Sequence, residues 1–321
     1  MITILDCTLR EGGYLNNWNF GAENIKKTIE NLLQAGIEYI EVGYLKEALI
    51  YDSNIAIFDN INRIQHLLKP SLKRIHLLFM INYGDFSISS IDKVNLDNGV
   101  CIEFRIAFHK KQYIEALTFS KKLIDKGFKV WVQPMEITTY SKEELLILSD
   151  AINKINPKVF CIVDSLGSIT PNVLPHIKEF LLKYIKSDIS IGFHFHNNMG
   201  FALYNAILLS SEYPNNNYVI DTSIAGIGRG TGNISTETMC TYLQNIDDKK
   251  YVFTYLFRAA DAALVNMPVH IKENVKNFIC AKYNLPIKKL KNTDNTNSLE
   301  EIENYIRKDF YHETNNISSS N

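Results

Sequence analysis

Two histidines separated by one residue, His194 and His196, mark the stretch of this chain with the clearest capacity for chemistry. They end Ile189–His196, a β-prone run that is followed by polar Asn197-Asn198. Side chains alternate between the two faces of a strand, so both imidazoles point the same way, roughly 6–7 Å apart along it. Such a pair can converge on one cation, although two hydrogen-bonded core histidines would give the same pattern. The run therefore predicts a strand that delivers two histidines to its carboxyl end.

The elements that must position these histidines alternate between strand and helix patterns. Apolar, β-prone runs predict strands at Ile2–Cys7, Tyr39–Gly43, Arg74–Ile81, Val100–Phe108, Lys129–Met135, Val159–Asp164, Ile189–His196 and Tyr218–Ile224. Helical spacing and capping residues predict helices at Glu23–Ala35, Asn54–Leu68, Ser87–Val94, Tyr113–Asp125, Ser141–Ile155, Pro171–Ile185, Gly200–Ser211 and Ser235–Gln244. Eight strand–helix units in about 250 residues predict an α/β fold, a (β/α)8 TIM barrel. The alternative is a doubly wound open sheet, which usually has fewer units.

Beyond the predicted barrel domain, residues 1–248, the alternation stops. Helical patterns continue at Tyr251–Val265, Ile271–Tyr283 and Leu299–Phe310, with no strand patterns between them. We therefore expect a small helical C-terminal extension at residues 249–311 and a disordered tail at residues 312–321.

Composition and charge exclude several classes of function. The chain has 321 residues, of which 46% are hydrophobic and 21% charged, and its formal net charge is −1. That balance gives no electrostatic case for binding nucleic acid or an acidic membrane surface. The N-terminus lacks the pattern of a signal peptide, and no apolar run reaches the roughly 18 residues of a membrane span. Five scattered cysteines without a Cys-x-x-Cys motif favour free thiols, so we expect a cytoplasmic protein.

Polar side chains collect at the predicted carboxyl ends of strands, where TIM-barrel active sites form. Glu11 follows the first strand, and Asn233 follows the eighth in the glycine-rich run Gly226–Asn233. Barrel closure makes strands one, seven and eight neighbours, so these two residues can meet the two histidines. Two imidazoles, a carboxylate and an amide oxygen suit a divalent cation that keeps open positions for substrate and water. The histidines favour Mn²⁺, Co²⁺, Fe²⁺ or Zn²⁺, whereas oxygen ligands alone would favour Mg²⁺.

Other candidate residues surround this predicted centre. Arg10 adjoins Glu11, either in a surface ion pair or as a fixed cation that stabilises an oxyanion or enolate. Five residues near strand ends are candidates for substrate contacts, with packing as the alternative role: Tyr44, His109, Gln133, Asp164 and Ser165.

Four motifs, in order along the chain, resemble those of the DRE-TIM metallolyases: Asp6–Gly13, Val163–Pro171, His194–Asn198 and Gly226–Asn233. The resemblance covers roughly residues 2–245 and is closest to the 4-hydroxy-2-oxovalerate aldolase branch. It implies a divalent metal, Mn²⁺ or Mg²⁺ with Co²⁺ or Zn²⁺ as alternatives, held by Glu11, His194 and His196. Asn233 would be a further ligand or would lie directly behind the ligands, and Arg10 would stabilise an enolate.

Two positions depart from the family pattern. Most members have Asp where this chain has Glu11, although the homocitrate synthases have Glu there. The bacterial hydroxy-oxovalerate aldolases carry a base histidine shortly after the first motif, where this chain has Tyr14. An ordinary tyrosine pKa near 10 makes a poor base, so we expect Tyr14 to act in catalysis as an acid or proton relay.

The resemblance implies cleavage or formation of the C3–C4 bond of a 4-hydroxy-2-oxo acid through a pyruvate enolate. The expected partners are then a 2-oxo acid and an aldehyde. The nearest alternative is an acetyl-CoA-dependent Claisen-type synthase, and a more distant one is an Fe(II) oxygenase, which the βα alternation disfavours. A third is a non-catalytic barrel that binds a partner such as an aldehyde dehydrogenase. The sequence leaves the oligomeric state open, with a homo-oligomer as one alternative.

Overall fold

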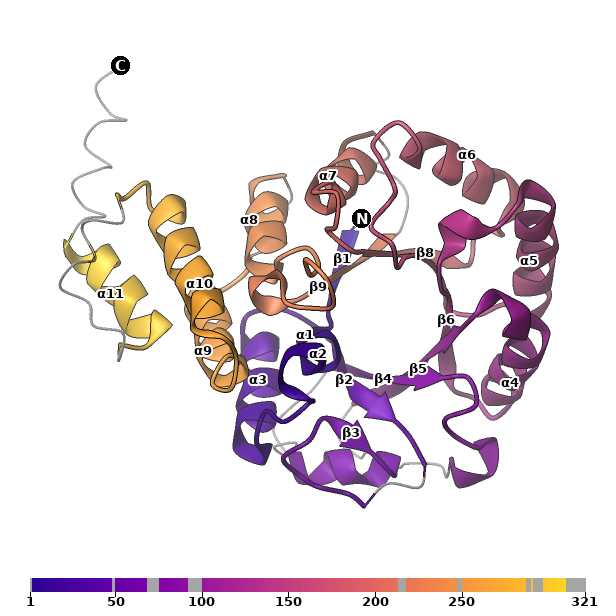
Figure 1. The fold of residues 1–321 in the computed structure, drawn as a ribbon, viewed down its shortest axis with the longest axis horizontal. Coiled ribbons are helices and arrows are strands. Elements are labelled where there is room, and N and C mark those ends of the chain that lie inside the picture. Colours follow the sequence, from indigo (N-terminus) through magenta and orange to yellow (C-terminus); the bar gives the residue numbers. More distant parts are fainter. Residues whose placement is uncertain are drawn as a thin grey trace.

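Parallel strands pair edge to edge and close into a barrel that helices surround (Figure 1). The computed structural model describes residues 2–47, 50–67, 75–91, 100–212, 218–246, 250–286, 290 and 297–309. In this part of the chain the strands are β1 (Ile2–Asp6), β2 (Tyr39–Leu45), β3 (Ile57–Phe58), β4 (His76–Asn82), β5 (Cys101–Phe108), β6 (Lys129–Pro134), β7 (Val159–Asp164), β8 (Ser190–Phe195) and β9 (Tyr218–Thr222).

The strand order establishes the barrel. The sheet runs β1-β9-β8-β7-β6-β5-β4-β2-β3, and parallel pairing of β1 with β2 closes it. Because β3 is a short parallel strand that only extends β2, the closed barrel consists of the other eight strands. The predicted (β/α)8 TIM barrel is confirmed.

Side chains on the barrel strands divide between two apolar clusters. Residues such as Phe104 and Phe193 belong to the larger cluster, which includes the apolar faces of the helices. Trp131 and Cys161 belong to a smaller cluster built almost entirely from alternate residues of the strands, which fills the barrel interior. Because both faces of the sheet are covered, its strands read as nearly continuous apolar runs, and any charged side chain on the inner face is forced into the interior.

Helices follow the strands as the barrel pattern requires. The α-helices up to the end of the barrel are α1 (Thr8–Glu11), α2 (Gly13–Asn16), α3 (Ala22–Gln34), α4 (Tyr113–Asp125), α5 (Lys142–Ile155), α6 (Leu174–Tyr184), α7 (Ala202–Glu212) and α8 (Thr236–Ile246). Short 3₁₀ helices are η1 (Ile61–Leu67), η2 (Ile88–Ser90), η3 (Lys110–Gln112), η4 (Ile137–Thr139) and η5 (Ile224–Gly226). The predicted capping box at Ser141 and Glu144 starts α5, with the Ser141 hydroxyl accepting the Glu144 N–H at 3.2 Å.

Two predicted helices were wrong in type or extent. The stretch predicted as a helix at Asn54–Leu68 contains β3 and η1 in place of an α-helix, and Leu68 itself lies outside the described residues. There the side chains of Asp52 and Asn60 accept hydrogen bonds from the N–H groups two residues ahead, which favours turns over α-helix. The helix predicted at Ser87–Val94 is reduced to η2, and residues 92–94 lie outside the described residues.

The C-terminal helices lie to one side of the barrel, next to α3 and α8 (Figure 1). They are α9 (Phe253–Ala263), α10 (Val269–Lys282) and α11 (Leu299–Asp309). α9 packs along α3, and the N–H of Val252 donates to the carbonyl of Ala35 at 3.1 Å. Residues 312–321 lie outside the described residues. No helix in the described ranges is both long enough and apolar enough to cross a membrane.

Candidate metal centre

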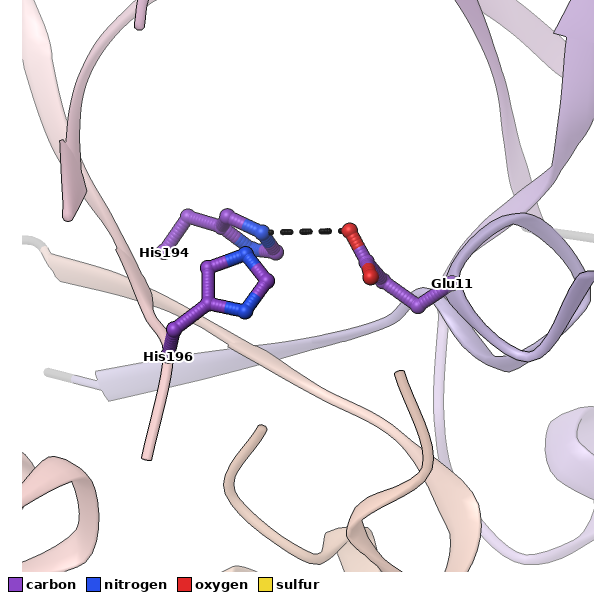
Figure 2. Close-up of side chains that lie close together, drawn as sticks. All are labelled: Glu11, His194 and His196. Atoms are coloured by element: carbon purple, nitrogen blue, oxygen red, sulfur yellow. Dashed lines mark ion pairs between the residues drawn. The ribbon is translucent and has the colours of Figure 1, made fainter. Parts of the chain in front are cut away.

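Glu11, His194 and His196 come together at the carboxyl ends of the barrel strands. One ligand atom from each lies within 4.8 Å of the other two, and His194 Nε2 is 3.3 Å from Glu11 Oε1. Figure 2 shows the two imidazoles on one side and the carboxylate facing them from the end of α1. All three side chains are buried. Of the His, Cys, Asp and Glu side chains in the described ranges, no other three form such a cluster.

Glu11 is held by a short helix that starts directly after β1. The N–H of Glu11 donates to the carbonyl of Cys7 at 2.8 Å. The carboxylate of Asp6 accepts the N–H of Thr8 at 2.9 Å and the hydroxyl of Thr236 at 2.7 Å, which fixes the turn between β1 and α1. Burial raises the pKa of Asp6 to about 6, against the opposing effect of these hydrogen bonds.

The contacts of the two histidines leave a nitrogen of each free to bind a cation. Nδ1 of His194 lies 2.9 Å from a carboxylate oxygen of Asp221, and Nδ1 of His196 lies 3.3 Å from the carbonyl oxygen of Arg229. The His194 N–H does not point straight at its carboxylate, so that contact is more electrostatic than a linear hydrogen bond. Both acceptors favour a proton on Nδ1 and therefore a bare Nε2, which is the form that ligates metals.

Electrostatics keep both imidazoles neutral. Burial lowers the pKa of His194, because desolvation disfavours the charged ring and outweighs the attraction of Asp221. Burial, followed by the charges of His194, Arg10 and Arg229, lowers the pKa of His196 to about 3. Neutral imidazoles are competent metal ligands at physiological pH.

Asn233 adds an amide oxygen beside this cluster. Its Nδ2 donates to the carbonyl of Ile227 at 3.0 Å, whereas its buried Oδ1 has no hydrogen-bond partner among the described residues. Gly228 leaves room for the amide, because a Cβ there would lie 2.3 Å from Asn233 Nδ2 and 3.0 Å from Glu11 Oε2. An unpaired buried acceptor costs about 1–3 kcal/mol, which a cation at this position would offset. The donor set therefore fits a divalent metal.

A network of buried charges supports the cluster. One oxygen of Glu41 lies 2.8 Å from Arg10 Nε and 2.9 Å from Arg105 Nη1. Arg105 also pairs with Asp221, and Arg10 with Glu11. In this network the two guanidiniums of Arg10 and Arg105 therefore face three carboxyl groups, and all five side chains are buried.

Three members of this network were missed in the sequence: Glu41, Arg105 and Asp221. Each is completely buried within a barrel strand; apolar residues flank Glu41 and Arg105 on both sides, and Asp221 lies between Ile220 and Thr222. A charged residue inside a largely apolar strand is the sequence signal that could have revealed these three residues. Such a charge is buried and must find a partner in the barrel interior.

A small cavity opens beside the proposed ligands, with a volume of about 70 Å³. At roughly 15 Å³ for each water, it holds on the order of five small groups, the size of a short 2-oxo acid. Eight of the predicted site residues line it: Arg10, Glu11, Tyr14, Tyr44, Gln133, Ser165, His194 and His196. Arg229 also lines it and was not predicted as a site residue.

Two tyrosines meet at this cavity. The hydroxyl groups of Tyr14 and Tyr44 are 3.0 Å apart, and Trp18 packs against both rings. The Trp18 indole also donates a hydrogen bond to the carbonyl of Arg10 at 2.8 Å. Burial raises the pKa of Tyr44, more strongly than the nearby Arg10 lowers it. Tyr44 is therefore a protonated donor rather than a base.

Two predicted substrate contacts lie outside the residues that line this cavity. Asp164 is buried and accepts the N–H groups of Ser168 and Ile169 at 2.9 and 2.8 Å, so its carboxylate shapes the loop after β7. His109 is exposed, and its N–H donates to the side chain of Gln112 at 3.2 Å at the start of η3. Gln133 does line the cavity and donates to the thiol of Cys161 at 2.8 Å.

Known proteins share this fold and sequence pattern. The 4-hydroxy-2-oxovalerate aldolase of Pelotomaculum thermopropionicum is 28% identical over 272 residues, which is 84% of this chain and 77% of that protein. The oxaloacetate decarboxylase of Mycobacterium tuberculosis is 23% identical over 256 residues, or 75% of this chain and 69% of that protein.

A solved structure, the N-terminal domain of an aldolase candidate from Bacteroides vulgatus, matches 98% of this chain and 99% of that chain, with a TM-score of 0.68 and 25% identity. The HMG-CoA lyase of Bacillus subtilis shares the fold over 88% of this chain and 94% of that chain, with a TM-score of 0.63 and 19% identity. The family model described as HMGL-like matches residues 1–262. The resemblance to the DRE-TIM metallolyases is thereby confirmed, and the chain belongs to the HMGL-like family of lyase-type enzymes.

Proposed function

We propose that this protein is a divalent-metal-dependent aldolase that makes or breaks the C3–C4 bond of a 4-hydroxy-2-oxo acid. The observation that carries the proposal is the convergence of Glu11, His194 and His196 beside a small cavity that Arg10 also lines. The relatives named 4-hydroxy-2-oxovalerate aldolase support the same reaction class. As the C3–C4 bond breaks, the 4-hydroxyl would lose its proton to solvent and become the aldehyde carbonyl. The bonding electron pair would remain on C3 as a pyruvate enolate.

Glu11, His194, His196 and Asn233 are the residues that would hold the metal. A bound Mn²⁺ or Mg²⁺, with Co²⁺ or Zn²⁺ as alternatives, would polarise the carboxylate and keto oxygens of the 2-oxo acid. The neutral imidazoles and the unpaired Asn233 oxygen suit this role.

Arg10 would stabilise the enolate. Its Nε is fixed by Glu41 at 2.8 Å, and its buried Nη2 has no hydrogen-bond partner among the described residues. Although burial disfavours the charged form, the combined attraction of Glu41 and other nearby groups outweighs it and raises the pKa of Arg10, so the guanidinium keeps its charge. A fixed buried cation beside a developing oxyanion lowers the barrier without having to reorganise.

Tyr14 and Tyr44 would supply the proton that converts the enolate to pyruvate. A hydroxyl proton would move to the enolate carbon, and Tyr14, which is 42% exposed, would recover a proton from solvent. Decarboxylation of oxaloacetate is a second candidate, since it forms the same enolate with CO₂ as the departing group. The relative named oxaloacetate decarboxylase favours it.

Hydrogen exchange into pyruvate tests the enolate directly. The metal-loaded protein in D₂O should replace the methyl protons of pyruvate with deuterium, measured by NMR, and EDTA or His196→Ala should stop the exchange. Tyr14→Phe should slow it by about 10²-fold or more, the usual contribution of a general acid. His270→Ala, which changes an exposed histidine of α10, is the matched control and should exchange normally. Absence of exchange in protein shown to contain metal would reject the proposal.

Several further expectations stay predictions. The sequence favours a cytoplasmic location, and all five cysteines are free thiols in the structure, as expected there. A homo-oligomer and an aldehyde dehydrogenase partner are two more of these predictions. We also retain the division into a barrel at 1–248 and an extension at 249–311, since α8 ends at Ile246 and α9 begins at Phe253.

A further inference from the structure

The loop after η5 holds the backbone of Arg229 against the proposed metal ligands. The N–H of Arg229 donates to Glu11 Oε2 at 3.4 Å, and its carbonyl accepts from His196 Nδ1 at 3.3 Å. The same carbonyl accepts the N–H of Gly232 at 3.2 Å. Farther along the loop, Asn198 Oδ1 accepts both the N–H and the hydroxyl of Thr231, at 3.2 and 3.0 Å. This residue therefore has a defined place beside the cluster.

The side chain of Arg229, unlike that of four other arginines, has no carboxylate partner among the described residues. Four other arginines, namely Arg10, Arg63, Arg105 and Arg258, pair with carboxylates. Within the described ranges, no carboxylate lies within ion-pair distance of the Arg229 guanidinium. Yet Arg229 lines the cavity with His196, and its positive charge is among the influences on that histidine, after burial and other charges.

The size of the cavity indicates where each end of a substrate would lie. The space of about 70 Å³ accommodates a short 2-oxo acid end beside Arg10 and the proposed metal ligands, and the cavity is open to solvent. The rest of a longer substrate must therefore extend toward the mouth. Arg229 lines the same cavity and is exposed, so its side chain is accessible to a substrate that extends out of the cavity.

We propose that Arg229 binds a second anionic group on the substrate, at the end away from the 2-oxo acid. The planar guanidinium presents paired donors that match a carboxylate or a phosphate, and no protein acid in the described ranges occupies them. The substrate class is then a 2-oxo acid that carries a distal anion. This inference rests on the proposed function, because Arg10 and the metal centre are assigned to the 2-oxo acid end.

Binding to the Mn²⁺-loaded protein, measured by isothermal titration calorimetry, tests this inference without turnover. Three ligands share a 2-oxo acid end and differ at the distal group: 2-oxoglutarate has a carboxylate, 2-oxo-4-phosphonobutyrate a phosphonate, and 2-oxovalerate a methyl group. The wild-type protein should bind one or both of the distal anions about ten-fold or more tightly than 2-oxovalerate. The preferred ligand distinguishes a carboxylate substrate from a phosphorylated one.

Substitutions of Arg229 complete the test. Arg229→Met keeps an unbranched apolar stem but removes the charge, and should abolish the preference for a distal anion, whereas Arg229→Lys should retain part of it. Arg307→Met, which removes an exposed charge on α11, is the matched control and should keep the full preference.

The outcomes separate this inference from the proposed function. A wild-type protein that exchanges pyruvate protons but shows no preference for a distal anion would overturn the role of Arg229 alone. A preference that survives Arg229→Met would overturn it as well. Failure of all three ligands to bind would overturn both. An Arg229-dependent preference without pyruvate exchange would support the anion site and reject the aldolase.

Discussion

Replacing Asp221 with Asn should weaken metal binding although Asp221 is not itself a proposed ligand. Asp221 is completely buried, lies 2.9 Å from Nδ1 of His194 and pairs with Arg105. The attraction of these two groups outweighs burial and lowers the pKa of Asp221, so the carboxylate is ionised. Asn keeps the shape but removes the charge that orients His194 and makes it a better ligand.

Two magnitudes follow from these contacts. A carboxylate behind a histidine ligand contributes about 10–100-fold to metal affinity, or about 1.4–2.7 kcal/mol. Breaking a buried ion pair costs about 3–5 kcal/mol of folding stability. Because Arg105 retains Glu41 as a partner at 2.9 Å, we expect a loss near the lower limit, about 3 kcal/mol.

Calorimetric titration of Mn²⁺ into the metal-free proteins measures the affinity, and urea denaturation followed by circular dichroism measures the stability. Glu103→Gln is the matched control, because Glu103 is also a buried carboxylate on an inner barrel face. It accepts hydrogen bonds from Lys158 at 2.6 Å and from the Trp131 indole at 2.6 Å. These contacts lie near the amino ends of the strands, away from the proposed metal ligands. The control should lose stability and keep its Mn²⁺ affinity. Wild-type Mn²⁺ affinity in folded Asp221→Asn protein would refute the role assigned to Asp221.

Three further predictions concern the metal centre. Burial, and then the charge of His194, lowers the pKa of His196 to about 3, while an unfolded histidine takes up its proton near 6.5. The metal-free protein should therefore lose stability as the pH falls from about 6.5 towards 3. In denaturation curves, His196→Gln should make the stability depend less on pH. An unchanged pH dependence in that variant would contradict the role given to His196. Gly228→Ala places a methyl group 2.3 Å from Asn233 Nδ2 and should weaken Mn²⁺ binding by about ten-fold or more in calorimetry, with the fold retained. Mn²⁺ at about 100 times its Kd should add about 2.7 kcal/mol of stability and raise the Tm, and EDTA should reverse the shift.

The barrel could be predicted because its strands are apolar on both faces and are separated by helices with clear periodicity. Local hydrogen bonds were harder to foresee. The stretch Asn54–Leu68 has helix-like spacing, but side chains such as Asp52 and Asn60 bond to the backbone and favour turns. The turn from β1 into α1 depends on the side chain of Thr236, which is 230 residues from its partner Asp6.

The proposed ligands could be placed from the sequence because motif order and barrel closure bring strand ends together. The charged residues that support these ligands could not be placed from the sequence. Arg105 and Asp221 are 116 residues apart and pair only because β5 and β9 face each other across the barrel interior. The sequence shows charged residues within largely apolar strands, whereas the identity of their partners depends on how the closed barrel aligns the inner faces.

The proposed cation site draws on the two ends of the barrel sequence, and this would have a consequence during synthesis on the ribosome. Glu11 emerges early, but His194, His196 and Asn233 follow only after most of the barrel has been translated. At about 5–20 residues per second, the interval is roughly 10–45 s. Throughout that time Arg10 and Glu11 belong to a chain without β9, whose pairing with β1 is needed to close the barrel. Tight metal capture at the proposed site would therefore report that a newly made chain has completed its barrel.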